Sequence, residues 1–282
     1  MKGGFIQYNG KFYRENEQLF ASTDLFRLGI GLCETFRAES NEILFAESVY
    51  QHLADAADSI NLKLPKDYDP NGLQLKRDVS RLLNKNKLYL SAQIVLQLFP
   101  GPNGSDIILS AVELPREFFP INENGLLLDI YTESKKPKNS ICNYEPGGRF
   151  LWMMAANAAS KLDKQNMFLL NNDGNICEAI SCSFGIIKNN LAIFPSAQSG
   201  GYQSSIIKQV VKCTKKCGFQ IIHKSDITVD ELLDADEIFL IDNCLGIQKV
   251  LGIRHRRFYS GKTVSIAAKL MEMAAADRAS KH

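Results

Sequence analysis

The sequence predicts an α+β protein built from two domains. Apolar residues recur at three- and four-residue steps between Arg149 and Leu162, which is the spacing of one helix face. A short apolar run, Met167 to Leu170, predicts a strand after this helix. The next residues, 171–174, are Asn-Asn-Asp-Gly, which form hairpin turns because they tolerate positive φ. With 282 residues, the chain is long enough for one large or two medium domains.

Composition argues against several classes of function. The chain has 33 Lys and Arg against 31 Asp and Glu, so its charge gives no reason to expect nucleic acid or an anionic membrane as a partner. There is no apolar segment of signal-peptide form and no run long enough to cross a bilayer, so we expect a cytoplasmic protein. The seven cysteines are scattered, and Cys213 and Cys217 have no second pair or histidine cluster nearby. We therefore expect reduced, buried thiols rather than a metal site.

The first 120 residues are predicted to form an α+β domain. A hairpin is expected within 5–15, around Asn9-Gly10. Residues 45–60 predict an amphipathic helix, because Val49, Leu53, Ala56 and Ile60 share one face. The remaining predicted elements are a helix at 71–84 and strands at 88–99 and 107–113, which flank a Pro- and Gly-rich turn at 100–104.

The second half is predicted to form a C-terminal α/β domain over 139–282. Residues 121–138 end in a basic loop that contains proline, and we expect them to connect the domains. The predicted elements of the second domain, besides those at 149–170, are strands at 176–179, 184–187, 191–194 and 236–240 and helices at 206–217, 227–236 and 263–279.

The stretch from Tyr144 to Ile187 carries the most specific motif: a helix, a strand, an Asp-Gly turn and then Glu178. This order resembles the class IV aminotransferases, the fold-type-IV enzymes of pyridoxal phosphate (PLP). That family includes branched-chain and D-amino-acid aminotransferases and aminodeoxychorismate lyase. The resemblance implies a two-domain, D-amino-acid aminotransferase-like fold, a homodimer, PLP as the cofactor and an amino acid or keto acid as the substrate.

Two other segments extend the resemblance over nearly the whole chain. Residues 23–36 contain the family pattern Gly-x-Gly-hydrophobic-Phe-Glu-Thr at Gly29, Gly31, Glu34 and Thr35, and Leu28 stands where the family has tyrosine. Residues 236–250 resemble the family's Asp-Glu and Gly-Ile-x-x-Val ending.

The resemblance also implies which residues bind the cofactor. In the family, a glutamate after the Asp-Gly turn keeps the pyridine nitrogen of PLP protonated, so that the ring can act as an electron sink. Glu178 matches that glutamate. The arginine of the family's His-x-x-Arg-Leu binds the cofactor phosphate. Aligning Leu53 with that leucine places His52 at the arginine, and histidine is mostly neutral at pH 7.

A glycine turn before a helix completes the expected phosphate site. In the family, a Gly-Ile-Thr/Ser-Arg turn opens a helix whose amide groups hold the phosphate, and helix N-termini suit anions generally. Gly201, Tyr202 and Gln203 occupy the corresponding place before the helix predicted at 206–217. Asn243, in the C-terminal segment of the resemblance, is the further residue expected to contact the cofactor.

The lysine that forms the cofactor imine is replaced at its expected position. The family pattern is Lys-x-x-Asn-Arg/Tyr-Leu, and the matching run is Glu145-Pro146-Gly147-Gly148-Arg149-Phe150. This alignment puts Glu145 at the lysine position. A carboxylate cannot condense with an aldehyde, so Glu145 cannot hold PLP covalently.

Other lysines are poor substitutes on sequence grounds. Lys138 lies seven residues before Glu145, which is about 23 Å along an extended chain, so only a sharply folded loop would bring it back. Aligning Asn143-Tyr144 with the family's Asn-Tyr would make Lys138 or Asn139 the lysine position, at the cost of one extra residue and a disrupted helix register. Lys161 and Lys164 lie towards the far end of the helix.

Three functions follow from these residues. The first is a PLP-dependent transaminase or lyase whose activity is impaired or changed by Glu145. The second is a dimer of the same fold that binds a ligand or a partner without transamination. The third is a different reaction in which Glu145 acts as a general acid or base.

Overall fold

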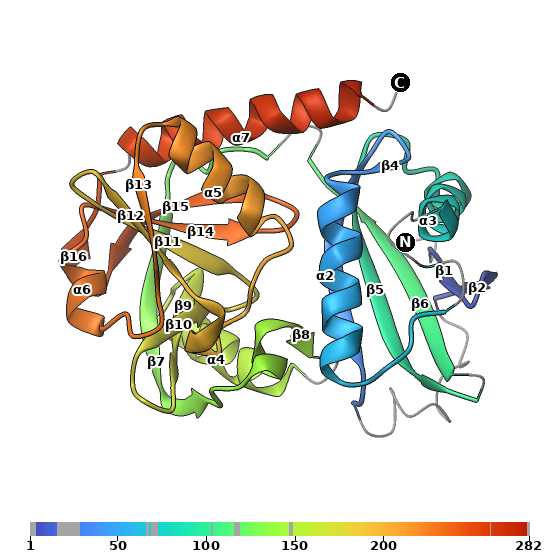
Figure 1. Cartoon of the computed structure of the whole chain (residues 1–282), viewed down its shortest axis with the longest axis horizontal. Helices are drawn as coiled ribbons and strands as arrows, with labels where there is room; N and C mark the ends of the chain where they lie inside the picture. The colour runs from blue at the N-terminus through green and yellow to red at the C-terminus, as the bar shows by residue number, and fades with distance from the viewer. Residues whose placement is uncertain are drawn as a thin grey trace. The chain divides into compact units, whose positions relative to one another are not determined.

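The computed structural model describes residues 4–15, 29–65, 68, 73–102, 104–115, 119–146, 149–259 and 261–280. The chain divides into two compact units (Figure 1). The first comprises Met1–Phe118, Glu145–Gly148 and Ala274–His282, and the second comprises Phe119–Tyr144 and Arg149–Met273. Leu28, Gly147 and Gly148, which enter the family alignment, lie outside the described residues.

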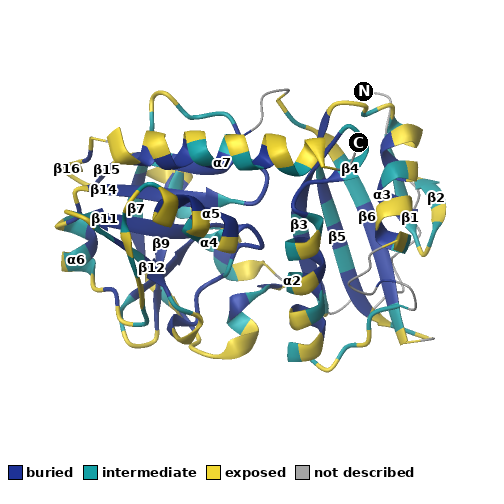
Figure 2. Ribbon diagram, turned by 45° about the horizontal axis from the view of Figure 1, so that its top comes forward, coloured by how far each residue is buried: buried dark blue, intermediate teal, exposed yellow. Residues whose placement is uncertain are grey.

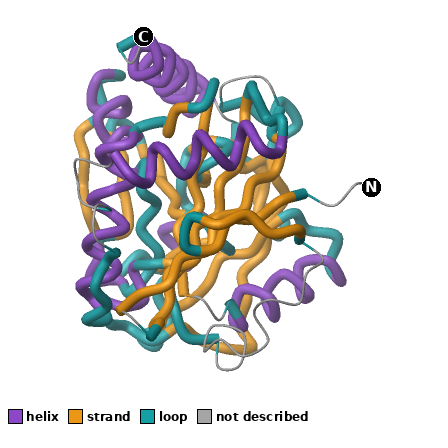
Figure 3. The backbone as a smooth tube through the Cα atoms, turned by 90° about the vertical axis from the view of Figure 1, so that its right-hand side faces the viewer, coloured by secondary structure: helices purple, strands orange, loops and turns teal. Residues whose placement is uncertain are grey.

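The first unit is built on a seven-stranded sheet. Its strands are β1 (Phe5–Tyr8), β2 (Lys11–Arg14), β3 (Leu32–Glu39), β4 (Glu42–Ile43), β5 (Ser91–Gly101), β6 (Gly104–Glu113) and β8 (Glu145–Pro146). They lie in the order β2-β1-β6-β5-β3-β4, and β8 pairs with β3. The predicted hairpin is β1–β2, which Figure 3 traces in orange beside the N-terminus. Asn9 and Gly10 form its turn with φ of 45° and 79°, values that these residues tolerate.

Two helices cover one face of this sheet. They are α2 (Ala46–Ser59) and α3 (Leu73–Asn86). Val49 and Leu53 of α2 and Val79 and Leu82 of α3 are buried in one cluster with apolar side chains of β3, β5 and β6. In Figure 2 the strands are mostly dark blue and the outer turns of both helices are yellow, as amphipathic patterning predicts.

The second unit is built on a nine-stranded mixed sheet. Its strands are β7 (Leu126–Lys136), β9 (Asn166–Asn171), β10 (Ile176–Ala179), β11 (Ser183–Lys188), β12 (Leu191–Pro195), β13 (Gln220–Lys224), β14 (Glu237–Asp242), β15 (Gly246–Ile253) and β16 (Arg256–Arg257). The order is β10-β9-β7-β15-β14-β11-β12-β13, and β16 pairs with β15. The rings of Phe168 on β9 and Phe184 on β11 are 5.2 Å apart although their strands are not neighbours. The sheet therefore curls around its own core.

Strand β7 corrects the expected connection at 121–138. It lies inside the second sheet, parallel to both β9 and β15. Leu128 and Ile130 are buried in the core of this unit, so the apolar residues of the segment give it a reason to form a strand rather than a linker.

Four helices of the second unit lie close to where the sequence predicts them. They are α4 (Phe150–Lys161), α5 (Ile207–Lys216), α6 (Val229–Leu233) and α7 (Gly261–Ala279), whose last residues belong to the first unit. The sequence does not predict the two short 3-10 helices, η1 (Ser140–Asn143) and η2 (Ala197–Ser199). Trp152 and Ala155 of α4 pack on β7, β9 and β10. In the described part of the chain, no helix is both long and apolar enough to cross a membrane.

Candidate functional site

The Glu178 carboxylate is the centre of a buried polar cluster in the second unit. Glu178 lies on β10 and is 0% exposed. Its Oε1 accepts a hydrogen bond from the indole N–H of Trp152 at 2.7 Å, and its Oε2 accepts one from the backbone N–H of Tyr202. The two aromatic rings meet edge to face, with their centroids 5.6 Å apart. An acidic residue after a turn is usually solvated, so its complete burial marks a specific role.

Lys136 supplies the positive charge of this cluster. Its ammonium forms an ion pair with Oε2 of Glu178 and donates to the carbonyl of Cys142 at 2.7 Å. Lys136 is the last residue of β7 and is 7% exposed. A buried carboxylate requires such a partner, because an unpaired charge in the interior is costly.

Sequence reasoning did not find Lys136. Side chains alternate between the two faces of a regular strand. The register of β7 with β9 shifts between Tyr131 and Lys136, so alternation counted from Leu128 and Ile130 does not place the Lys136 side chain. Lys138, the substitute considered from the sequence, instead pairs with Asp173 at 2.7 Å on the surface.

The turn before α5 uses its amide groups within the protein. These are the groups that the family resemblance assigns to a phosphate. The donors and acceptors are Gly201 N to Ser199 Oγ (3.1 Å), Tyr202 N to Glu178 Oε2, Gln203 N to Asn143 O (2.8 Å) and Ser204 N to Ser183 Oγ (2.7 Å). An anion at this turn would have to displace acceptors that are already bound.

Packing explains Gly201 without a ligand. A Cβ at this position would lie 1.9 Å from the carbonyl oxygen of Cys177, so the backbone of the turn sits directly on β10. Ser205, which follows the turn, carries a buried hydroxyl without a hydrogen-bond partner.

Asn243 belongs to the same buried cluster. Its Nδ2 donates to the hydroxyl of Tyr202 at 2.8 Å, and its Oδ1 accepts from the hydroxyl of Ser204. Asn243 therefore fixes the Tyr202 ring from the loop after β14. The second unit thus brings together Glu178, Tyr202 and Asn243.

His52 and Glu145 lie in the first unit. His52 Nδ1 is hydrogen-bonded to Glu34 Oε2 at 2.6 Å, between α2 and β3. Glu145 is 3% exposed, pairs with Cys33 of β3, and accepts the Thr35 hydroxyl at 3.2 Å. Both side chains thus have polar partners within their own unit.

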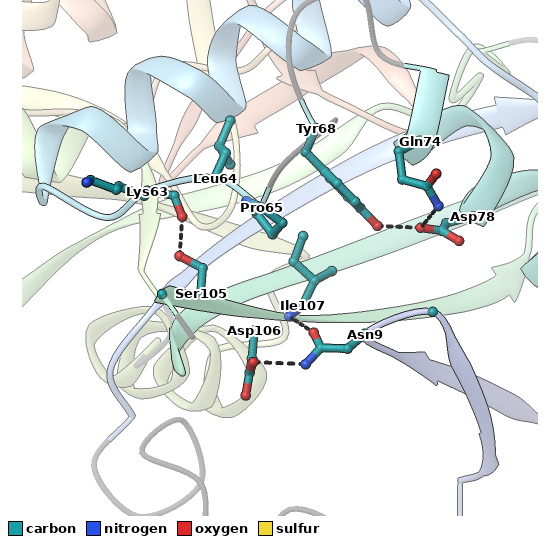
Figure 4. Close-up of a pocket in the computed structure, with 12 residues that line it drawn as sticks. Asn9, Lys63, Leu64, Pro65, Tyr68, Gln74, Asp78, Ser105, Asp106 and Ile107 are labelled. Carbon is teal, nitrogen blue, oxygen red and sulfur yellow. Dashed lines mark hydrogen bonds between the residues drawn. The ribbon is translucent and has the colours of Figure 1, made fainter. Parts of the chain in front are cut away.

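The first unit also has a cavity of about 480 Å³ (Figure 4). Asp78 accepts from the Tyr68 hydroxyl at 2.6 Å and from the Gln74 amide at 3.0 Å. On the opposite wall, Asp106 accepts from the Asn9 amide at 2.8 Å. Both bonds to Asp78 use Oδ2, whereas its buried Oδ1 has no hydrogen-bond partner and lies 3.6 Å from the Arg81 guanidinium. Within the described residues no group of His, Cys, Asp and Glu is arranged to hold a metal ion.

Comparison with known proteins decides the family. The model of the family described as amino-transferase class IV matches residues 31–253. The chain belongs to the class IV aminotransferases. This assignment confirms the family that the motifs indicated.

Relatives of this class IV aminotransferase match it over nearly its full length. The chain is 25% identical over 270 residues to a probable branched-chain-amino-acid aminotransferase of Thermotoga maritima, covering 95% of this chain and 93% of that protein. The branched-chain aminotransferase of Thermoproteus uzoniensis, solved with norvaline, superposes with a TM-score of 0.85 at 17% identity, covering 98% and 96% of the two chains. A hypothetical aminotransferase of Mycobacterium tuberculosis in its PLP-bound form superposes with a TM-score of 0.80 at 14% identity, covering 96% of this chain and 98% of that chain. The predicted two-domain, fold-type-IV architecture is confirmed.

Proposed function

We propose that this chain is a member of the class IV aminotransferase family that does not transaminate. The observation that carries the proposal is Glu145, a buried carboxylate hydrogen-bonded to Thr35 at the position aligned with the imine lysine. A transaminase needs a primary amine there, first to condense with the cofactor aldehyde and then to move a proton. A carboxylate supplies neither the condensation nor a neutral amine base.

The remaining residues support the same conclusion, because they do not fit PLP as the family would hold it. The amide groups of the turn at 201–204 already have internal acceptors. His52, aligned with the phosphate-binding arginine, is bound to Glu34. Among the residues that the structure describes, the groups aligned with the family's phosphate site are thus already hydrogen-bonded within the protein.

Mixing the purified protein with PLP and borohydride tests the proposal. We expect no reducible imine, no protein adduct by mass spectrometry, and no exchange between amino acids and keto acids. An adduct together with exchange would overturn the proposal. Peptide mapping would then identify the lysine, with Lys136 and Lys138 as the residues to check first. Thermal unfolding before and after PLP shows that the sample is folded.

Glu145 favours a second candidate function, general acid or base catalysis. A carboxyl held out of water by a sheet and bound through one oxygen to a hydroxyl is a chemically competent proton carrier. The test is Glu145→Gln, with Thr35→Val as a second variant that removes the hydroxyl partner. If a turnover activity is found and Glu145→Gln leaves its rate and pH profile unchanged, this role is excluded.

We also propose a cytoplasmic homodimer. All seven cysteines, which lie within the described ranges, are free thiols, as a reducing compartment requires. Helix α4 exposes Phe150 (67%) and Met153 (51%) on one face, and Ile141 (48%) lies just before it. Such apolar side chains favour contact with a second copy. Sedimentation should give a dimer for the natural chain and a monomer for Phe150→Glu. A natural chain that stays monomeric at micromolar concentration would contradict this proposal.

A further inference from the structure

Lys136 occupies the chemical role that the cofactor has in the family. In a PLP enzyme of this family, the glutamate accepts a hydrogen bond from the protonated, positively charged ring nitrogen. Here Oε2 of Glu178 accepts a hydrogen bond from the positively charged ammonium of Lys136. Both donors are cationic N–H groups, and such charge-assisted bonds are the strongest kind available to a buried carboxylate.

Both oxygens of the Glu178 carboxylate already accept hydrogen bonds from the protein. Glu178 Oε1 holds the indole N–H of Trp152, and Oε2 holds both Lys136 and the Tyr202 amide. The side chains of Trp152 and Tyr202 are buried against Tyr131 and Leu169 in the same cluster. The carboxylate is therefore satisfied without any bound molecule.

The position of Lys136 also differs from that of an imine lysine. The pyridine nitrogen and the carbon that forms the imine lie at opposite ends of the PLP ring. An imine lysine is therefore separated from the ring-nitrogen carboxylate by the width of the ring. Lys136 touches that carboxylate directly and is held in place by the Cys142 carbonyl at 2.7 Å.

We propose that Lys136 is a built-in replacement for the cofactor's protonated ring nitrogen, which makes the fold of the second unit independent of PLP. The inference rests on the proposed function only in taking Glu178 as the ring-nitrogen carboxylate. It implies that removing the Lys136 side chain leaves a cation site beside Glu178. A primary alkylammonium ion of the size of the deleted atoms fits that site.

The experiment compares Lys136→Ala with Lys138→Ala. The two lysines are separated by one proline, and both pair with a carboxylate, but the second pair is exposed. Trp152 is the only tryptophan of the chain and donates to Glu178, so its fluorescence reports on the site directly. Thermal unfolding followed by this fluorescence is measured with and without propylammonium, which replaces the atoms missing from alanine. Tetramethylammonium, a cation without N–H donors, is the salt control.

We expect Lys136→Ala to lower the unfolding temperature several times more than Lys138→Ala. Propylammonium should restore much of that loss and return the Trp152 emission towards that of the natural chain, whereas tetramethylammonium should not. Equal effects of the two alanine variants, or equal effects of the two cations, would overturn the inference. A borohydride-fixed PLP adduct on Lys136 of the natural chain would also overturn it.

A second set of variants keeps the test decisive if Lys136→Ala does not fold. Lys136→Met and Glu178→Gln are each expected to destabilise the protein. The double variant should be more stable than the sum of the two losses predicts, because neither buried charge is then left alone. Additive losses would contradict the inference. Transamination by the natural chain would instead refute the proposed function, and would leave the measured coupling between Lys136 and Glu178 unaffected.

Discussion

Two lysines close together in the sequence form ion pairs of very different character. Lys136 and Glu178 pair inside the second unit, with side chains 8% and 0% exposed. Lys138 and Asp173 pair at the surface, with side chains 35% and 54% exposed. Water screens the second pair and would solvate either partner alone. The first pair has no such alternative, so each of its charges depends on the other.

If the chain does not use PLP, as we propose, the difference explains how Glu178 can stay buried without the cofactor. A buried glutamate without a cationic partner would destabilise the protein. Lys136 removes that penalty from within the chain. The surface lysine, although better placed in the sequence to substitute for the missing amine, has no part in the cluster.

The largest effect is expected when the acid of the buried ion pair is replaced by its amide. Glu178→Gln should cost about 3–5 kcal/mol of unfolding free energy, because it leaves the Lys136 ammonium buried without a counter-charge. Asp173→Asn, the matched exposed change, should cost about 0–1 kcal/mol. Urea unfolding followed by Trp152 fluorescence measures both. Similar losses for the two variants would show that burial does not distinguish the pairs.

The next effect separates packing from ligand binding at the glycine turn. Gly201→Ala should cost about 1–3 kcal/mol even without any ligand, because overpacking displaces the turn from β10. Its new Cβ would lie 1.9 Å from the Cys177 carbonyl. Gly261→Ala is the control, because a Cβ there meets nothing within 4 Å at the start of α7. A Gly201→Ala protein as stable as the control would mean that the turn is free to move.

A third prediction concerns Asp242, a carboxyl whose hydrogen-bond partners, unlike those of Glu178, are backbone N–H groups and a thiol. Burial raises the pKa of Asp242 above its ordinary value of 3.8, although the backbone N–H groups of Cys244 and Leu245 oppose the rise. A carboxyl whose folded pKa is raised favours folding below the unfolded pKa. That contribution is lost as the pH rises through the folded pKa.

The measurement for Asp242 is the free energy of unfolding across the acidic range. Between the unfolded pKa and the raised folded pKa, the natural chain should lose stability relative to Asp242→Asn as the pH rises. An unchanged difference between the two proteins over this range would show that the burial of Asp242 carries no such penalty.

The smallest effect is expected at Ser205. Its buried hydroxyl has no hydrogen-bond partner, so Ser205→Ala should stay within about 0.5 kcal/mol of the natural chain. Ser183→Ala should cost about 1–3 kcal/mol, because Ser183 Oγ bonds to both the Ser204 amide and the Tyr202 carbonyl. A large loss at Ser205 would reveal a bound partner at this hydroxyl.

Much of the fold could be predicted because its signals are local. The helix over Phe150–Lys161 and the hairpin of β9 and β10 follow from periodicity and turn chemistry within a few residues. The basic, proline-containing end of the segment 121–138 predicts a connection between domains, although residues 126–128 are apolar. Only the pairing of β7 with β9 and β15 identifies it as an interior strand.

The sequence by itself determined the family, through Glu178 after its turn and the spacing of the surrounding motifs, and it predicts a carboxylate at the position aligned with the imine lysine. Only the tertiary structure decided which lysine reaches Glu178. Lys136 and Glu178 are 42 residues apart, on β7 and β10 at either side of β9. Alternation along a strand indicates which face a side chain takes, but the partner across the sheet depends on the strand order, which no local pattern encodes.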